Sequence, residues 1–292
     1  MKVTVLYFRF PLLAGFFTCF CFGNIFAGGE GFVLGSRSVG SGQIGILYSD
    51  IWSVHNNIGA IGWLKQGGLG VSFDNRYNLQ ALNQISFSAA TVSEKYGTLG
   101  FGASRFGSDL FNQSKASLGW AKAFGIASIG IQGQWAQTAA TEFPTRHYFL
   151  LNFGGLARLT SKLHFAASIS NITQTKASEF QEERIPTIVR AGIAFLPNAK
   201  VKILSEVQKD LDLKSIVKIG LEYEFVKKVW IRTGFSSQIE QVSGGLGIQW
   251  RNFQFDYAIA NHPQLGWTNS IGINFLIGKQ VDKKAEDKKE VQ

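Results

Sequence analysis

The feature that most constrains this chain is a period-two alternation of large apolar residues with small or polar ones, which begins near residue 67. In the stretch SIVKIGLEYEF, residues 215–225, one face collects the apolar side chains and the other the small and charged ones: Val217, Ile219, Leu221, Tyr223 and Phe225 against Lys218, Gly220, Glu222 and Glu224. Successive side chains of a β-strand point to opposite faces. The stretch therefore predicts a strand with one apolar face and one polar face.

The same alternation recurs in FQFDYAIA, SIGIQGQWAQ and SIGINFLIG. It predicts about fourteen strands of about 8 to 14 residues, which suits the roughly 9–11 residues that a tilted strand needs to cross a bilayer. An even count places both ends of the strand region on the same side of a membrane, which we expect to be the periplasmic side. The predicted strands start near residues 67, 82, 96, 111, 125, 147, 162, 186, 199, 214, 228, 240, 252 and 267.

The connections between these segments alternate between tight and longer ones. The tight links are SEKY, AFG, TSK, PNA, VKK and WRN, and the longer ones are mainly RYNLQA, GSDL, TAATEFPTR, TQTKASEFQEERI, KDLDL, SQIE and NHPQLG. Short periplasmic turns and longer outer loops are typical of outer-membrane barrels. A soluble β-sandwich has no physical reason to keep that rhythm through so many strands.

Composition separates a membrane barrel from a soluble all-β protein. The chain has 33 Gly and 25 Phe but only 5 Pro among 292 residues, and charged residues make up 17%. The faces opposite the apolar ones are rich in Gly, Ala, Ser and Gln rather than in Lys and Glu, which suits a lumen better than a solvated surface. In lipid, only a closed barrel satisfies every backbone hydrogen bond of a sheet. The predicted fold is therefore an all-β, transmembrane antiparallel β-barrel of about 14 strands, residues 67–278, with an N-terminal hatch or plug segment.

The N-terminus has the features of a secretory signal peptide, residues 1–27. Lys2 and Arg9 precede an apolar stretch, residues 11–26, and Ala27 is a small residue at the expected cleavage point. An uncleaved anchor is the alternative, but the apolar stretch is shorter than the roughly 20 residues that span a bilayer. We therefore expect an exported protein of the outer membrane of a Gram-negative bacterium.

Both cysteines of the chain, Cys19 and Cys21, lie in this predicted signal peptide. A lipoprotein is the second alternative, although FFTC lacks the Leu and small residue of a lipoprotein signal. Without cysteines, the mature chain has no disulfide framework and no thiolate metal site.

Residues 28–66 lack clean alternation, and we expect them to form the plug inside the barrel or beneath its periplasmic mouth. The stretch DIWSVHNN predicts a short helix starting at Asp50, because Asp is a good N-cap residue. Residues 279–292 predict a charged, disordered periplasmic tail. A tether to a partner is the alternative role for that tail.

Two sequence features could suggest nucleotides. The formal net charge is +9, but the basic residues are scattered singly apart from KKVW and the tail, so we expect no nucleic-acid partner. GSGQIG, residues 40–45, matches the dinucleotide fingerprint G-x-G-x-x-G, which requires a surrounding βαβ unit. No such unit is present, so we interpret it as a glycine turn and expect no cofactor.

No catalytic or metal site emerges from the sequence. Neither H-E-x-x-H nor G-x-S-x-G occurs, and the four histidines are scattered. We therefore expect no enzyme activity and no bound metal.

The alternation predicts a set of ionic side chains in the lumen of the second half of the barrel. One interpretation is a salt-bridge network that holds the barrel and its plug; the other is a polar constriction that contacts or gates a solute. Arg37 could reach the inward glutamates and lock the plug. The inward residues are Arg190, Lys202, Glu206, Lys218, Glu222, Glu224, Arg232 and Asp256.

Four tryptophans lie near predicted strand ends, where an aromatic girdle meets the membrane interface. A ligand cage is the alternative interpretation. They are Trp135, Trp230, Trp250 and Trp267.

The stretch GSRSVGSGQIGILYSDIWSVHNNIGAIGWL resembles the N-terminal segment of FadL/PorV-like outer-membrane proteins. Gly35-Ser36-Arg37 corresponds to a Gly-Ala-Arg-rich stretch, and residues 56–61 correspond to an Asn-Pro-Ala-Gly-Leu-type motif in which Ile58 replaces the usual Pro. RIPTIVRAGIAF, IRTGFS, FDYAIANHPQLGWT and the last strand extend the resemblance over most of the mature chain.

The resemblance implies a 14-stranded barrel and two alternative functions. In the FadL branch the N-terminal segment is a hatch and the cargo is a hydrophobic small molecule. In the PorV branch the barrel is a non-enzymatic component of type IX protein secretion or surface assembly. Gly272, Phe275 and Ile277 are similar to the signal read by the barrel-assembly machinery, so that machinery and outer-membrane lipid are expected partners.

Overall fold

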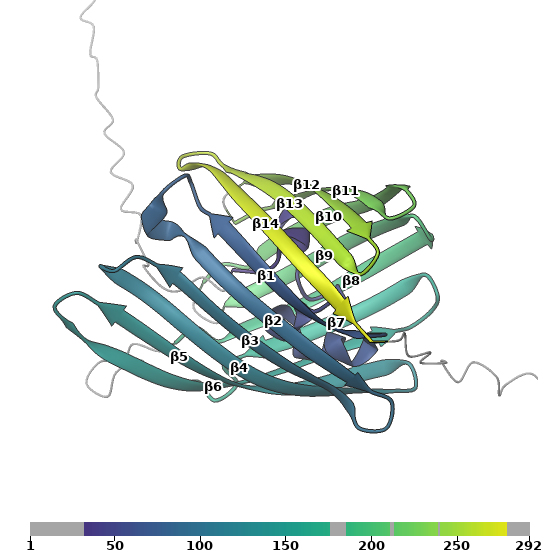
Figure 1. The fold of residues 1–292 in the computed structure, drawn as a ribbon, viewed down its shortest axis with the longest axis horizontal. Coiled ribbons are helices and arrows are strands. Elements are labelled where there is room, and N and C mark those ends of the chain that lie inside the picture. The colour runs from purple at the N-terminus through teal and green to yellow at the C-terminus, as the bar shows by residue number, and fades with distance from the viewer. Residues whose placement is uncertain (1–31, 176–184, 211–212, 239, 279–292) are drawn as a thin grey trace, which may run out of the picture.

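A computed structural model of the chain describes residues 32–175, 185–210, 213–238 and 240–278. The described residues form one closed antiparallel β-barrel in which every strand pairs with its neighbours in the sequence and β1 pairs with β14 (Figure 1). The predicted all-β barrel of fourteen strands is confirmed. Within the described ranges, no helix is long and apolar enough to cross a membrane. The predicted signal peptide and the charged tail lie outside the described residues.

The strands begin within a few residues of the predicted starts. They are β1 Gly67–Asn75, β2 Gln84–Ser93, β3 Gly97–Gly107, β4 Phe111–Phe124, β5 Ala127–Ala140, β6 Phe143–Arg158, β7 Leu163–Ser170, β8 Ile188–Asn198, β9 Val201–Asp210, β10 Ile216–Val226, β11 Val229–Ser236, β12 Gln241–Trp250, β13 Phe253–His262 and β14 Gly266–Ile277.

The barrel closes through a ladder between its first and last strands. Gly67 pairs with Ile277 at one end of this ladder, and Asn75 pairs with Asn269 at the other. The start of β1 and the end of β14 therefore lie at the same end of the barrel, together with the six short turns. We call this the short-turn end and the opposite one the long-loop end.

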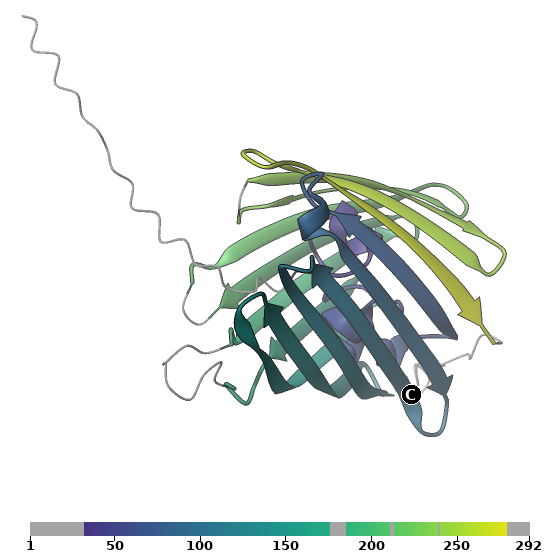
Figure 2. The same cartoon turned by 60° about the vertical axis from the view of Figure 1, so that its left-hand side comes forward.

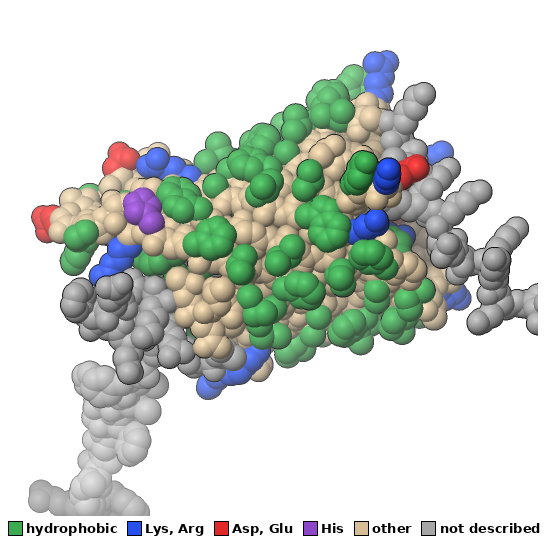
Figure 3. Space-filling model, turned by 90° about the horizontal axis from the view of Figure 1, so that it is seen from below, with side chains coloured by type: hydrophobic (Ala, Val, Ile, Leu, Met, Phe, Trp, Pro, Cys, Tyr) green, Lys and Arg blue, Asp and Glu red, His purple; other side chains and the backbone are tan. Residues whose placement is uncertain are grey.

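The alternation fixes which side chains face out. Ile219, Leu221 and Phe255 are 54%, 40% and 43% exposed on the outer wall, whereas Lys218 and Glu222 on β10 and Asp256 on β13 are buried inside. Figure 3 shows the resulting apolar side chains spread over one flank of the barrel. The predicted faces of β10 and β13 are correct.

One predicted loop is wrong. Residues 138–146, TAATEFPTR, were expected to be a long loop, but β5 and β6 continue through them and leave only Thr141 and Glu142 between the strands. Thr138 pairs with Arg146 and Ala140 with Phe143, with a register shift between the two pairs. Pro144 is tolerated because a sheet accepts Pro at such irregular or edge positions. Because β5 extends to Ala140, Trp135 lies within the strand rather than near its end.

The wall is irregular between β6 and β8, because β7 pairs with β6 only over residues 153–158. Beyond Ser170 the chain turns at Asn171, which has φ +56°, and irregular hydrogen bonds replace the ladder. The backbone N–H of Ile172 donates to the carbonyl oxygen of Leu151 at 2.9 Å, and the Thr175 hydroxyl donates to that of Phe149 at 3.0 Å.

Residues 32–66 lie inside the barrel and form its core; we call them the inner segment (Figures 1 and 2). They contain α1 Ser36–Gly40, α2 Ser53–Asn56 and η1 Ile58–Trp63; a further short helix, η2 Gln80–Leu82, lies in the β1–β2 connection. The η1 helix contacts β4, β5 and β6, while α1 contacts β12 and β13. Ile44, Ile46 and Trp63 pack against Leu156 and Leu204 of the wall.

Two local predictions from the sequence concern the inner segment. The helix expected at Asp50 begins three residues later, at Ser53, because the turn between them is closed by i to i+3 hydrogen bonds, from Ser53 N–H to Asp50 O and from Val54 N–H to Ile51 O. The Asp50 carboxylate still accepts from the backbone N–H of Trp52 at 3.0 Å, as an N-cap side chain does. In GSGQIG, Gly42 has φ +78°, and a Cβ there would lie 2.8 Å from both Ile219 O and Phe235 N. The motif therefore serves as a glycine turn that approaches the wall closely.

Candidate functional site

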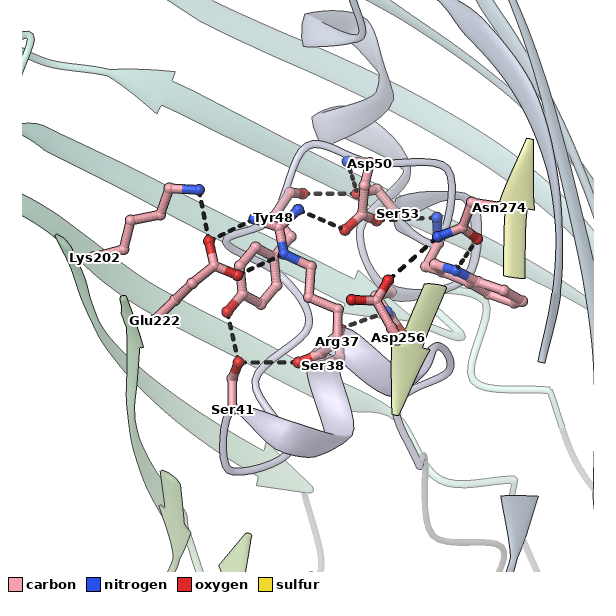
Figure 4. A network of polar contacts seen from close by, with 12 residues as sticks. Arg37, Ser38, Ser41, Tyr48, Asp50, Ser53, Lys202, Glu222, Asp256 and Asn274 are labelled. Atoms are coloured by element: carbon pink, nitrogen blue, oxygen red, sulfur yellow. Dashed lines mark hydrogen bonds and ion pairs between the residues drawn. The ribbon is translucent and has the colours of Figure 1, made fainter. Parts of the chain in front are cut away.

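Glu222, on β10, is the centre of an ionic network between the inner segment and the wall (Figure 4). Arg37 of α1 binds it through two hydrogen bonds, from Nε to Oε2 at 2.8 Å and from a terminal nitrogen to Oε1 at 2.7 Å. From neighbouring strands, Arg232 Nε donates to Oε2 at 2.7 Å and Lys202 Nζ to Oε1 at 2.9 Å. Charge-assisted, bidentate pairs of this kind are among the stronger polar contacts in proteins.

The network extends through two more carboxylates. Arg232 donates to Asp256 at 2.6 Å, and Arg37 donates to Asp50 at 3.3 Å. Three cations and three carboxylates are thus in contact, so the network is balanced in charge. Burial disfavours the charged form of Arg37, but Glu222 and Asp50 outweigh it and raise the pKa of its guanidinium well above the ordinary value. Arg37 remains a cation and holds α1 against the wall.

A second ion pair holds the glycine turn. Lys218 Nζ lies 2.9 Å from Glu206 Oε1 and donates to the carbonyl oxygen of Gln43 at 2.8 Å. The other oxygen of Glu206 accepts from the backbone N–H groups of Gly45 and Ile46 at 3.1 and 3.3 Å. These two wall residues therefore satisfy backbone groups of the inner segment that would otherwise be buried without partners.

The structure separates the nine ionic residues named from the sequence. Seven belong to the two clusters just described: Arg37, Lys202, Glu222, Arg232 and Asp256 in one, and Glu206 with Lys218 in the other. Arg190, on the inner face of β8, adjoins the second cluster, because it donates to Gln208 Oε1 at 3.1 Å and Lys218 Nζ donates to the same oxygen at 2.9 Å. Glu224 accepts from the backbone N–H of Lys228 at 2.9 Å, at the short-turn end of β10.

A cavity of ≈ 390 Å³ lies between the inner segment and the long-loop end of the barrel. It borders the irregular part of the wall between β6 and β8. Its lining combines apolar and aromatic side chains with amides, hydroxyls and two cations. The lining residues are Phe32, Leu34, His55, Asn56, Gln84, Ser104, Phe106, Phe111, Gln113, Lys115, Ser117, Gln134, Leu150, Asn152, Ser170, Asn171, Ile185, Pro186, Ile188 and Arg190.

Lys115, on the inner face of β4, is the charged member of this lining that the sequence analysis did not name. The described residues that line the cavity include Lys115 and Arg190 but no carboxylate. Arg76 lies close by, with its guanidinium 3.6 Å from the ring centre of Phe32. Alternation could have identified Lys115, because Leu118 and Trp120 face outward and an odd-numbered residue of β4 therefore faces inward. The surrounding stretch NQSKAS is polar on both faces, so it shows no clear alternation.

His55 joins the inner segment to the cavity and gives the structure a pH dependence. Its Nε2–H donates to the carbonyl oxygen of Phe87 at 2.9 Å. Burial, together with the nearby Lys115, lowers the pKa of His55 to about 4, although the Phe87 hydrogen bond opposes this shift.

An undocked His55 would titrate near its ordinary pKa of about 6.5. Its contribution to docking is therefore complete above pH ~6.5 and is lost progressively as the pH falls towards 4, because the undocked state then binds the proton. We expect hydrogen exchange across residues 32–66, corrected for intrinsic rates, to quicken over that pH interval. His55→Gln keeps a donor but cannot titrate, so its profile should be flatter; identical profiles would contradict the prediction.

Comparisons with known proteins support the fold. No protein-family model matches the chain, and no curated protein matches it in sequence. Its structure is similar to that of the CymD monoaromatic hydrocarbon channel, with a TM-score of 0.62 and 11% identity over 84% of this chain and 98% of that one.

Two further solved structures are similar. A mutant of the TodX monoaromatic hydrocarbon channel has a TM-score of 0.61 and 11% identity over 85% of this chain and 98% of its own. A FadL homologue from Pseudomonas aeruginosa has a TM-score of 0.57 and 10% identity over 84% and 99%. The fold is thus that of FadL-like outer-membrane barrels, and at these identities the likeness concerns the fold alone.

Proposed function

We propose that this chain is an outer-membrane barrel that binds a hydrophobic or amphipathic small molecule in the cavity at its long-loop end and passes it across the membrane. Its inner segment serves as the plug of the barrel. The short-turn end, with both ends of the strand region, faces the periplasm. No catalytic role is assigned to any residue.

The observation that carries this proposal is the cavity itself. A volume of ≈ 390 Å³ is within the range of small-molecule pockets, which are mainly apolar with a few polar groups that fix orientation. Phe106, Phe111, Leu150 and Ile188 supply apolar surface to the lining. The hydrocarbon channels with the same fold favour a hydrophobic solute over a sugar or an ion.

The polar part of the cavity favours a solute with an anionic end. Lys115 is a cation in a lining whose described residues include no carboxylate, and buried charge is stable only when it is paired or hydrated. A carboxylate or phosphate on the solute would pair with Lys115, while its apolar part contacts Leu150 and the phenylalanines. With an uncharged solute, the Lys115 ammonium group would have to be hydrated instead of paired.

The secretion-component alternative, PorV-like, has no support of its own from the fold. The three similar structures described above are two hydrocarbon channels and a FadL homologue. We therefore retain the solute-binding function.

A binding experiment with decanoate, decanol and toluene tests this proposal. Leu150 is buried against the cavity, so Leu150→Trp should fill it and weaken binding of all three probes by about tenfold or more. Lys115→Met should weaken decanoate by about tenfold, the value of one hydrogen bond to a charged group, and leave decanol and toluene unchanged. Titration calorimetry on the purified barrel provides the measurement.

Leu246→Trp is the matched control, because Leu246 is 53% exposed on the outer wall. Unchanged binding in Leu150→Trp would remove the cavity as the site. Equal loss of decanoate and decanol in Lys115→Met would instead contradict the role of the cation and leave the cavity in place.

A further inference from the structure

The short-turn end carries a ring of cations. Five of the six short turns contain at least one: Lys95, Lys162, Lys200, the pair Lys227–Lys228, and Arg251. Next to the sixth turn, Lys122 faces outward from the end of β4 and donates to the carbonyl oxygen of Lys95 at 3.0 Å. None of these seven rim cations forms an ion pair with a described carboxylate, although Glu94 and Glu224 lie in the same region.

The long-loop end differs in charge. Its exposed described residues include four cations and three carboxylates: Arg105, Arg146, Lys209 and Lys214 with Asp109, Glu142 and Glu240. Arg105 and Asp109 lie 3.8 Å apart as an ion pair. In Figure 3, blue Lys and Arg side chains border the green apolar surface at the right-hand, short-turn end. Among the residues that the structure describes, the unbalanced positive charge is therefore a property of one end.

The backbone holds these turns in fixed positions relative to one another. The carbonyl oxygens of Lys162, Lys200 and Lys228 accept from backbone N–H groups of the next hairpin at 2.7, 2.8 and 2.9 Å. The carbonyl oxygens of Ile126 and Asn252 accept in the same way, at 2.7 and 2.8 Å. The backbone positions from which these side chains extend are thus fixed around the closed barrel.

Aromatic side chains place this ring at a particular depth. The Arg251 guanidinium lies 5.1 Å from the ring centre of Trp250, and Lys95 Nζ lies 5.2 Å from that of Tyr96. Trp250 is 59% exposed on the outer wall. Tryptophan and tyrosine mark the membrane–water interface, and long basic side chains next to them extend into the headgroup layer.

We propose that the rim cations bind the phosphate groups of anionic phospholipids in the leaflet that surrounds the short-turn end. The cations encircle the barrel, whereas an acidic protein partner would need them gathered on one face. Turns of about two to four residues keep them in the headgroup layer, where positive side chains attract anionic lipids. This inference depends on the proposed membrane location but not on the solute cavity.

The densest part of the ring provides the test. Lys227, Lys228 and Arg251 lie on adjacent turns, which the hydrogen bond from Gln249 N–H to Lys228 O joins. The full barrel is reconstituted in nanodiscs of phosphatidylethanolamine with a minor fraction of phosphatidylglycerol. Native mass spectrometry then counts the phosphatidylglycerol that remains bound. We expect the triple variant K227Q/K228Q/R251Q to reduce its enrichment by roughly fivefold.

The matched control is R105Q/K209Q/K214Q, which removes the same charges from exposed positions at the long-loop end. It should keep the enrichment, and added salt should lower the enrichment of the wild-type barrel, since salt screens exposed charges. Equal enrichment in the wild type and the rim variant, or equal loss in both triple variants, would overturn the proposal. So would enrichment that salt leaves unchanged. Solute binding in the rim variant should be unaffected, which separates this proposal from the cavity.

Discussion

Replacing Glu222 with glutamine is expected to release the inner segment from the wall. The substitution leaves the cations Arg37, Arg232 and Lys202 around a neutral amide. Asp50 and Asp256 are then the two carboxylates left in the network against three cations in a buried site. Breaking a buried ion pair by removing one partner costs about 3–5 kcal/mol. The expected result is faster hydrogen exchange across residues 32–66 and a higher conductance in planar bilayers, because a displaced plug opens the lumen.

The same change two residues along the strand is the control. The one contact described above for Glu224 is with a backbone N–H of its own hairpin. Glu224→Gln should therefore change the free energy of unfolding by less than about 1 kcal/mol. A double variant, E222Q with Arg37→Gln, should recover part of the loss, since it removes one of the unpaired cations. Identical exchange and conductance in E222Q and E224Q would contradict the role of Glu222.

A single methyl group at Gly59 is expected to have the second large effect. A Cβ there would lie 2.3 Å from Gly154 O and 2.6 Å from Gly155 Cα, and both atoms belong to the backbone of β6. The η1 helix must then move away from the wall and weaken the bond from Asn57 Nδ2 to Gly155 O. Overpacking of this kind costs about 1–3 kcal/mol or more. Gly59→Ala should lower the midpoint temperature of thermal unfolding and speed amide hydrogen exchange in residues 57–64.

Gly244→Ala provides the comparison, because the nearest atom to its added Cβ is Arg232 O at 3.8 Å. This variant should unfold like the wild type. If Gly59→Ala matched it in thermal midpoint and exchange, the close approach of η1 to β6 would not determine how the inner segment docks.

The period-two alternation predicted the barrel because strand faces depend on local chain geometry. The residues of β10 show this: Ile219 and Leu221 face outward, and Lys218 and Glu222 face inward. The pattern failed at residues 138–146, because large apolar residues do not alternate with small or polar ones there and Phe143 is the only large apolar residue. A strand without an apolar face has the composition of a loop.

The detailed conformation of the inner segment could not be predicted, for a different reason. Its conformation depends on distant partners: Trp52 Nε1 donates to Asn274 Oδ1 at 2.8 Å, and these residues lie 222 positions apart in the chain. No local periodicity records such a contact. The cavity was missed likewise, since Lys115, Leu150 and Arg190 meet only when β4, β6 and β8 curve around the same space.

The contacts of the inner segment also constrain the order in which this chain assembles. The segment precedes β1, so it leaves the ribosome first, yet Arg37 needs Glu222 of β10 and Trp52 needs Asn274 of β14. Until those late strands are in place, these two side chains lack their native partners in the wall, although His55 and Asn57 can already bond to β2 and β6. Docking of the segment is therefore completed only after the last strand has joined the barrel.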